Sequence, residues 1–224
     1  MPTPIMTAAT LSPAAYAHAE RFLAGLDADW RRHVAATGAC LHRPLPAREP
    51  YEALVRAIAY QQLHARAGDA IVGRLLALFP GGAFPAPGQL LAADPAALRA
   101  CGFSAAKTQT ILGIAQAARD GVVPDRRAAR RMSDQALVER LTTLRGVGRW
   151  TVEMLLIYTL ARADILPADD FGVRDGYRRL KGGAATPTAR QMRDIGQAWG
   201  PYRTLAAWYL WRVPPEARIR AQET

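Results

Sequence analysis

Apolar residues along this chain recur mostly at helical spacing. After Pro50 they fall at intervals that favour burial of a helix face, in one helix or in two: Leu54, Ile58, Leu63, Ile71 and Leu75. Strand signals are few and short, and there is no internal repeat. The pattern therefore predicts an all-α fold.

Residues suited to capping mark where several of these helices begin. Ser or Asp before a helix accepts a hydrogen bond from its first turn, and proline fits directly after such a residue. The expected starts are Ser12-Pro13, Asp94-Pro95, Ser104 and Ser133.

The segment TLRGVGRWTVEML, residues 143–155, places two glycines between two helical stretches. Glycine inside a helix costs about 0.5–1 kcal/mol relative to alanine, so the pair marks a sharp turn. Val147 is expected to plug the interface between the two helices. Neither Gly146 nor Gly148 has a side chain to shield the amides that begin the second helix, and such amides bind anions. A DNA phosphate is one interpretation, and an ordinary turn without a ligand is the other.

Charge favours the nucleic-acid interpretation. The 224 residues carry a formal net charge of +10, and the pI is about 10.4. A strongly basic protein attracts polyanions, nucleic acid first. Lys107 and Lys181 are the only lysines, so almost all of the positive charge is arginine. Because the chain is also rich in alanine, this is typical of a GC-rich coding background, and arginine count alone does not establish DNA binding.

Other classes of protein are not favoured. Cys40 and Cys101 are the only cysteines and lie far apart, which argues against a disulfide framework, a structural zinc site and a four-cysteine iron–sulfur cluster. No apolar run approaches the roughly 20 residues that a membrane span needs. The first residues lack the charged and apolar parts of a secretory signal. We therefore expect a cytoplasmic protein without membrane association, nucleoid-associated if its source is bacterial.

Four stretches of the chain form a series from about Tyr51 to Trp211: AIAYQQLHARAGDAI, LRGVGRWT, LPADDFGVR and WGPYRTLAAWYLW. Each is moderately specific alone. In this order and spacing they resemble the helix–hairpin–helix (HhH-GPD) DNA glycosylase superfamily, and within it the AlkA-like and Mag-like 3-methyladenine DNA glycosylases. The chain before Tyr51 is too short for the N-terminal β domain of larger members, so the resemblance implies a compact, Mag-like form.

The resemblance implies that Asp170, the second acidic residue of LPADDFGVR, is the catalytic residue. Breaking an N-glycosidic bond builds positive charge on the sugar, which a carboxylate stabilises, or it helps to deprotonate the attacking water. An alkylated purine is already cationic and leaves readily, so a strong general acid is less necessary. Asp169 is expected to be a helix cap or a structural contact. The alternative for the pair is plain capping of the following helix.

Trp150 bears on the type of reaction. Relatives that also cut the DNA backbone, such as endonuclease III, carry at this position a lysine that forms a Schiff base with the sugar. The resemblance therefore implies a monofunctional glycosylase that leaves an intact abasic site.

The resemblance also implies an aromatic pocket for a base flipped out of the duplex. Trp150, Phe171 and Trp211 match positions that line it, and ring faces favour a cationic methylated base by about 0.5–2 kcal/mol. Met154 and Gly172 stand where the best-known bacterial member has a tyrosine and a leucine, so a more open pocket is expected. Other aromatic residues nearby are expected to pack in the core: Trp199, Trp208 and Tyr202.

Further DNA contacts are expected outside the hairpin. Gln62 in YQQLHA matches the family position that fills the gap left by the flipped nucleotide, and His64 could reach the minor groove or a phosphate. Ser104 and Lys107, at the start of a helix, are candidate phosphate contacts. For all four, a solvated helix end is the alternative. The predicted DNA-binding set is Gln62, His64, Ser104, Lys107, Gly146, Gly148, Arg149 and Thr151.

The resemblance implies two helical subdomains with a DNA cleft between them. Residues 46–163 are expected to form the central one, which ends in the helix–hairpin–helix at about 133–160. Residues 1–45 and 164–224 are expected to form the other. The expected partner is double-stranded DNA containing alkylated bases, bound by a monomer.

No organic cofactor is implied, and no side chains suggest a metal site. Hairpins of the family can bind a monovalent cation through backbone carbonyls, here near Leu144 and Gly146.

Two other functions stay open. One is a non-catalytic helix–hairpin–helix DNA-binding protein, against which Asp170 and the pocket aromatics argue. The other is a glycosylase for oxidised or mismatched bases.

Overall fold

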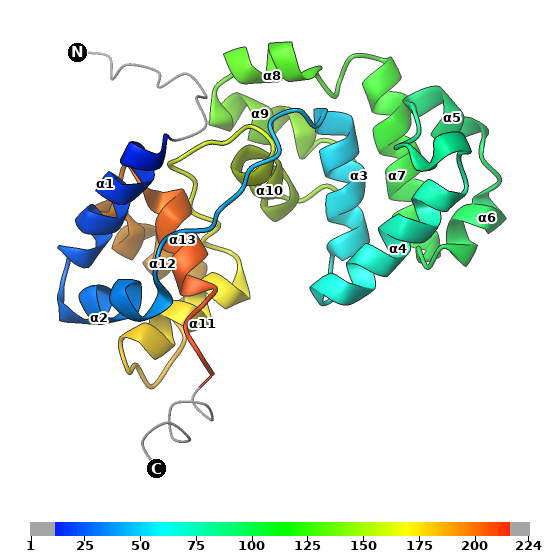
Figure 1. The fold of residues 1–224 in the computed structure, drawn as a ribbon. Coiled ribbons are helices and arrows are strands. Elements are labelled where there is room, and N and C mark those ends of the chain that lie inside the picture. The colour runs from blue at the N-terminus through cyan, green and yellow to red at the C-terminus, as the bar shows by residue number, and fades with distance from the viewer. Residues whose placement is uncertain (1–11, 216–224) are drawn as a thin grey trace. The chain divides into compact units, whose positions relative to one another are not determined.

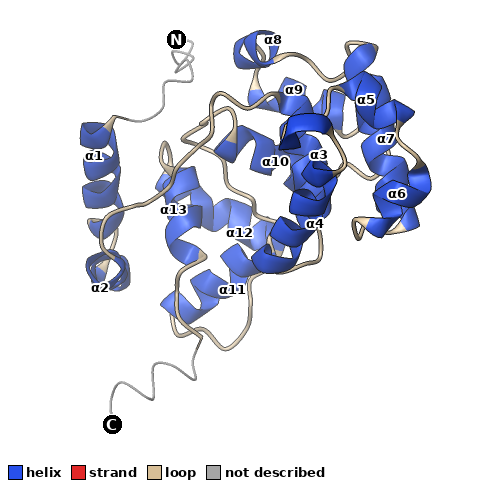
Figure 2. Ribbon diagram, turned by 45° about the vertical axis from the view of Figure 1, so that its right-hand side comes forward, coloured by secondary structure: helices blue, strands red, loops and turns tan. Residues whose placement is uncertain are grey.

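The structure, a computed structural model, describes residues 12–215. Every regular element in that range is a helix, and no strand occurs in it, which confirms the all-α prediction (Figure 2). The described chain divides into two compact units. The resemblance implies boundaries after residues 45 and 163, whereas the structure places them after Pro44 and Leu160.

The first unit, Leu45–Leu160, is called the hairpin unit below. In Figure 1, α3 is flanked by α4, α7 and α10, and α5 lies along α7. Its elements are α3 (Pro50–Tyr60), α4 (Ala65–Ala77), η1 (Pro80–Gly82), α5 (Pro87–Ala92), α6 (Pro95–Ala100), α7 (Ala105–Arg119), α8 (Arg126–Arg131), α9 (Asp134–Leu141) and α10 (Arg149–Tyr158).

The apolar repeat that follows Pro50 forms two helices, α3 and α4. Its members within the helices are buried, since each lies on an apolar helix face: Leu54, Ile58, Ile71 and Leu75. Leu63 lies in the turn between the helices and is 41% exposed, so its expected burial is wrong. The repeat does not continue through a turn, because the backbone there no longer advances by a helical step.

The second unit, residues 12–44 and 161–215, is called the carboxylate unit below. Within it, α13 contacts α1, α2 and α11. Its elements are α1 (Pro13–Ala24), α2 (Ala28–Thr37), α11 (Phe171–Leu180), α12 (Ala189–Ile195), η2 (Gly196–Trp199) and α13 (Arg203–Leu210).

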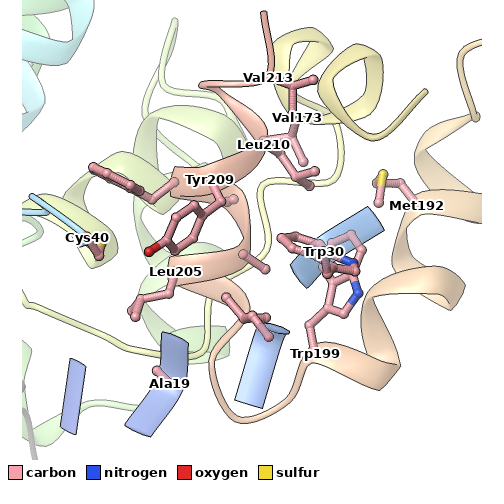
Figure 3. Packing of buried hydrophobic residues seen from close by; sticks show 14 of the residues in the cluster. Ala19, Trp30, Cys40, Val173, Met192, Trp199, Leu205, Tyr209, Leu210 and Val213 are labelled. Atoms are coloured by element: carbon pink, nitrogen blue, oxygen red, sulfur yellow. The ribbon is translucent and has the colours of Figure 1, made fainter. Parts of the chain in front are cut away.

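Large aromatic side chains fill the core of the carboxylate unit (Figure 3). Trp30 and Trp199 meet edge to face with ring centroids 5.5 Å apart, a favourable arrangement for aromatic pairs. Trp199 and Trp208 are buried and Tyr202 packs against the same cluster, which confirms that these three aromatics belong to the core. This core supports α11 and α13, on which the carboxylate described below depends.

Side-chain caps begin the helices at the expected places. Ser12, Asp94, Ser104 and Ser133 each accept a hydrogen bond from a backbone N–H in the first turn of the helix that follows, at 2.9–3.2 Å. The helices of residues 12–215 are short, and the longest of them, α7, has 15 residues. Among the described helices, none has both the length and the apolar character to cross a lipid bilayer.

Candidate functional site

The bend between α9 and α10 is built on a glycine that the fold requires. Gly146 has a φ of +80°, a left-handed conformation that residues with side chains rarely adopt. A Cβ there would lie 2.3 Å from Oγ1 of Thr110 on α7. Val147, the next residue, is buried as predicted. The turn thus lies tightly against α7, and any side chain at Gly146 would force the two apart.

Gly148 differs, because nothing inside the protein requires a glycine there. Its φ of −87° and ψ of 169° are open to ordinary residues, and a Cβ would meet no atom within 4 Å. Gly148 is the N-cap of α10, and no side chain caps that helix. The amides of a first helical turn are positively polarised and attract anions. The bare N-cap therefore suits close approach of an anion from outside.

The two polar residues at the start of α10 have different surroundings. Arg149 is half-exposed, and its Nε donates to Oε1 of the buried Glu153 at 2.9 Å. Thr151 is 1% exposed, and its hydroxyl oxygen accepts a 3.0 Å hydrogen bond from Nε2 of Gln61. Its side chain supports the hairpin from inside, because the hydroxyl is turned to Gln61. A DNA contact through Thr151 stays a prediction. A phosphate contact of Arg149 stays a prediction.

Trp150 and Met154 lie one turn apart on α10 and share one face of the helix. Both side chains are half-buried. The short helix α10 therefore carries both predicted pocket residues. Its first turn also belongs to the hairpin that would bind a phosphate.

Gln62 stands out in the turn between α3 and α4. It is exposed and has a φ of +58°, one of two non-glycine residues with positive φ among those described. Such a conformation costs on the order of 1–3 kcal/mol and persists only where the surroundings enforce it. His64, also exposed, is the N-cap of α4 and makes no side-chain capping bond. Both predicted DNA contacts are thus on the surface of the hairpin unit.

Ser104 and Lys107 have structural partners at the start of α7. The Ser104 hydroxyl accepts a hydrogen bond from the backbone N–H of Lys107 at 3.2 Å, so this residue is a helix cap. The Lys107 ammonium donates to the backbone oxygens of Gln61 at 2.7 Å and Ala59 at 3.4 Å, at the end of α3. Burial lowers the pKa of Lys107 below its usual value. Phosphate contacts for both residues stay predictions, and so do the alternatives of a solvated helix cap and a surface lysine.

Asp170 is the N-cap of α11 in the carboxylate unit. Its Oδ1 accepts two hydrogen bonds, from the backbone N–H of Val173 at 2.9 Å and from the indole Nε1–H of Trp211 at 3.0 Å. Asp169 is exposed and pairs with Arg193 at 3.5 Å. Asp169 is thus a structural contact, as expected, whereas the capping role belongs to Asp170. Capping and catalysis are not exclusive, since the cap fixes the plane of the carboxylate.

Glycine at position 172 leaves room for this arrangement. A Cβ there would lie 3.0 Å from Oδ1 of Asp170 and 3.0 Å from Cδ1 of Trp211. Phe171, the first residue of α11, is 65% exposed, so the core does not account for an aromatic ring beside Asp170. The carboxylate unit thus brings together Asp170, Phe171 and Trp211, three of the predicted site residues.

A match to a known protein family spans the segments that carry most of these features. Residues 55–201 match the family described as HhH-GPD superfamily base excision DNA repair protein, and this span covers more than half of the chain. The chain belongs to the HhH-GPD superfamily.

Relatives within the HhH-GPD superfamily cover most of the chain. DNA-3-methyladenine glycosylase 1 of Schizosaccharomyces pombe is 45% identical over 196 residues, which is 87% of this chain and 86% of that protein. The alkylbase DNA glycosidase-like protein mag2 of the same organism is 36% identical over 200 residues, 89% of this chain and 94% of that protein.

Solved HhH-GPD structures agree with the fold. The S. pombe Mag1 glycosylase in complex with abasic DNA matches with a TM-score of 0.83 and 44% identity, over 87% of this chain and 95% of that chain. A DNA-3-methyladenine glycosidase from Bacillus halodurans matches with a TM-score of 0.74 and 29% identity, over 94% of this chain and 93% of that chain. DNA is therefore the partner of this protein.

The backbone carbonyls of the HhH-GPD hairpin already accept hydrogen bonds from the protein. Leu144 O accepts from Val147 N at 3.0 Å, and Gly146 O accepts from Nε2 of Gln61 at 3.2 Å. A carbonyl oxygen has a second lone pair, so a monovalent cation at these oxygens stays a prediction. Among residues 12–215, no three His, Cys, Asp or Glu side chains are grouped as metal ligands.

Gln61 is the residue of the site that sequence reasoning missed. It precedes the more conspicuous Gln62, and no local pattern distinguishes the two amides. Its contacts with Gly146 and Thr151, across 85 and 90 residues, show that it belongs to the hairpin.

Proposed function

We propose that this protein is a monomeric, monofunctional DNA glycosylase that removes cationic alkylated bases, such as 3-methyladenine, from double-stranded DNA. The observation that carries the proposal is the carboxylate of Asp170, oriented by Val173 and Trp211 at the start of α11. The relative with 45% identity is named DNA-3-methyladenine glycosylase 1, and the similar Mag1 structure contains abasic DNA. Removal of a base is the reaction that produces an abasic site.

In the proposed reaction, the bond between C1′ of the deoxyribose and the base nitrogen breaks. Its electron pair goes to the base, which neutralises a cationic alkylated purine without a proton donor. Water forms the new bond to C1′ and gives up one proton, which the Asp170 carboxylate accepts. The same carboxylate stabilises the positive charge that builds on the sugar. Because two N–H donors fix Oδ1, the group needs little rearrangement as that charge develops.

The lysines support a monofunctional reaction. Strand cleavage through a Schiff base needs a neutral amine. Burial lowers the pKa of Lys107, but its side-chain nitrogen is held by two backbone oxygens at the end of α3. Lys181 pairs with Asp27 and Asp29, and these hydrogen bonds outweigh burial and raise its pKa, which disfavours the neutral amine. The position that bears a lysine in strand-cleaving relatives is Trp150 here.

Selection of the base is assigned to aromatic ring faces. The half-buried ring of Trp150 lies at the start of α10, in the hairpin, and the exposed ring of Phe171 follows Asp170 directly at the start of α11. A ring face attracts a cationic base more strongly than its neutral parent. The bare N-cap at Gly148 supports binding of a backbone phosphate regardless of sequence.

A panel of defined duplexes tests the proposal. Each carries one lesion: a cationic methylated purine, 8-oxoguanine or a mismatch. We expect release of the methylated base, an intact strand until alkali is added, and no adduct after borohydride treatment. Release of 8-oxoguanine or a mismatched base alone would favour the oxidised-base or mismatch alternative. Binding of every duplex without release of any base would favour the non-catalytic alternative.

A further inference from the structure

The turn that carries Gln62 holds a strained conformation on the protein surface. Gln62 is exposed and left-handed, between the end of α3 at Tyr60 and the start of α4 at Ala65. A side-chain-bearing residue leaves this conformation unless neighbouring bonds enforce it. The bonds that hold the turn therefore determine where the Gln62 amide points.

One of these bonds runs from the turn to the hairpin. The side chain of Gln61 donates from Nε2 to the backbone oxygen of Gly146 at 3.2 Å and to the hydroxyl of Thr151 at 3.0 Å. Gly146 lies before the bare N-cap Gly148, and Thr151 lies after it. A single amide therefore contacts the hairpin on both sides of the predicted phosphate site.

A second contact comes from α7. Lys107 donates to the backbone oxygens of Ala59 and Gln61, the residues on either side of Tyr60, where α3 ends. Carbonyls at a helix C-terminus lack partners within the helix, and a cation there is favourable. One turn further along α7, Thr110 lies directly under Gly146. The same helix thus contacts both the Gln62 turn and the hairpin.

We infer that Gln61 and Lys107 are positioning residues that hold the Gln62 turn in fixed register with the hairpin. The inference rests on the proposed function, in which Gln62 fills the gap left by the flipped nucleotide. Binding of a phosphate at the hairpin then sets the place at which Gln62 enters the duplex. Gln61 acts through Gln62 and the hairpin, and it does not touch the reacting atoms.

Gln61→Met tests the first positioning residue, since it keeps the length of the side chain and removes the amide donor. We expect single-turnover base release to fall about tenfold, the order expected for the loss of a hydrogen-bonding group, while affinity for undamaged DNA changes less than about twofold. Fluorescence of 2-aminopurine opposite the lesion reports entry of Gln62 and should fall in parallel. Gln116→Met, at an exposed position of α7 in the same unit, is the control and should match the wild type.

A double-mutant cycle separates positioning from general structural damage. If Gln61 acts through Gln62, then Gln61→Met causes little further loss in a Gln62→Ala background. Multiplicative losses in the two variants, or an equal loss of affinity for undamaged DNA, would overturn the inference. If Gln61→Met fails to fold, Thr151→Val removes the hydroxyl acceptor with little change in shape, and a smaller loss of the same kind is expected.

Lys107→Met distinguishes positioning from a phosphate contact. If Lys107 is a positioning residue, Lys107→Met lowers base release and the 2-aminopurine signal. The slope of the logarithm of the DNA-binding constant against the logarithm of salt concentration then stays unchanged. Loss of one phosphate contact would instead reduce that slope by about one, and this result would overturn the role of Lys107. A wild-type protein that releases no base contradicts the proposed function. An active wild type with unchanged Gln61→Met activity contradicts only the inference.

Discussion

The indole of Trp211 and the carboxylate of Asp170 are joined by a 3.0 Å hydrogen bond, from Nε1–H to Oδ1. The same oxygen accepts a hydrogen bond from the backbone N–H of Val173, so one bond comes from α11 and the other from the residue that follows α13. Trp211 was predicted as a wall of the base pocket. Its position assigns it a further task, which is to fix the orientation of the carboxylate.

Trp211→Phe separates these two tasks, because it keeps an aromatic ring and removes the N–H donor. We expect single-turnover base release to fall about tenfold, since one hydrogen bond to a charged group contributes about 1.5–3 kcal/mol. The melting temperature should change little, because Val173 still binds the cap. Single-turnover assays with excess enzyme, stopped at successive times, measure the rate of the chemical step. Unchanged release would mean that the indole N–H has no role in orienting Asp170.

Gly172→Ala is expected to reduce activity although alanine is the better helix former by about 1 kcal/mol. The added methyl would lie 3.0 Å from both Asp170 Oδ1 and Trp211 Cδ1, so one of them must move. Gly113→Ala on α7 is the matched control, because a Cβ there meets nothing within 4 Å. We expect the control to retain activity and to gain or keep stability. Equal activity of the two variants would show that the space at Gly172 is not needed.

The two hairpin glycines should respond differently to alanine. Gly146→Ala combines a left-handed φ with a clash against Thr110, so it should lower the free energy of unfolding by about 1–3 kcal/mol or more. Gly148→Ala should leave the melting temperature nearly unchanged and weaken binding to undamaged DNA. Thermal unfolding and binding at one fixed salt concentration check both expectations. Wild-type DNA affinity in Gly148→Ala would argue against a phosphate at the bare N-cap.

Acid stability should depend on the ion pairs of Lys181. Burial raises the pKa of Asp27, but the hydrogen bond and charge of Lys181, with the N–H groups of Asp29 and Trp30, outweigh it and lower the pKa overall. A carboxylate with a lowered pKa in the folded state contributes stability above its unfolded pKa of about 3.9, and that stability is lost as pH falls through the folded pKa. Lys181→Met should therefore unfold at a higher pH than the wild type.

The size of this effect should be modest, because the Asp27 side chain is 41% exposed and exposed pairs contribute about 0–1 kcal/mol. Circular dichroism followed from neutral to acid pH gives the midpoint of unfolding. Arg190→Met removes a positive charge from an exposed position and is the control. If both variants shift the midpoint equally, net charge rather than the Lys181 pairs determines acid stability.

Features set by local rules could be predicted from the sequence. The serine and aspartate caps depend on bonds within one helical turn, and the burial of Val147 follows from its place between two glycines. The predicted burial of Leu63 was wrong, because helical periodicity does not show where a turn interrupts a helix. Capping by Asp170 was foreseen as an alternative, and the resemblance to a family assigned catalysis to the same residue.

Features that join distant segments could not be predicted. The bond between Trp211 and Asp170 spans 41 residues, and that between Gln61 and Thr151 spans 90. Neither side chain carries a local signal of its partner. Thr151 was predicted to bind DNA because its motif does, and only the packed structure shows that its hydroxyl is turned inward.

Asp170→Asn is the most direct test of the central claim, that the Asp170 carboxylate performs the chemistry. Asparagine is as good an N-cap as aspartate, and its side-chain oxygen can still accept from Val173 and Trp211. We predict an unchanged melting temperature, retained binding to DNA with a methylated base, and base release slower by about 10²-fold or more. Release at the wild-type rate by the folded variant would contradict the account.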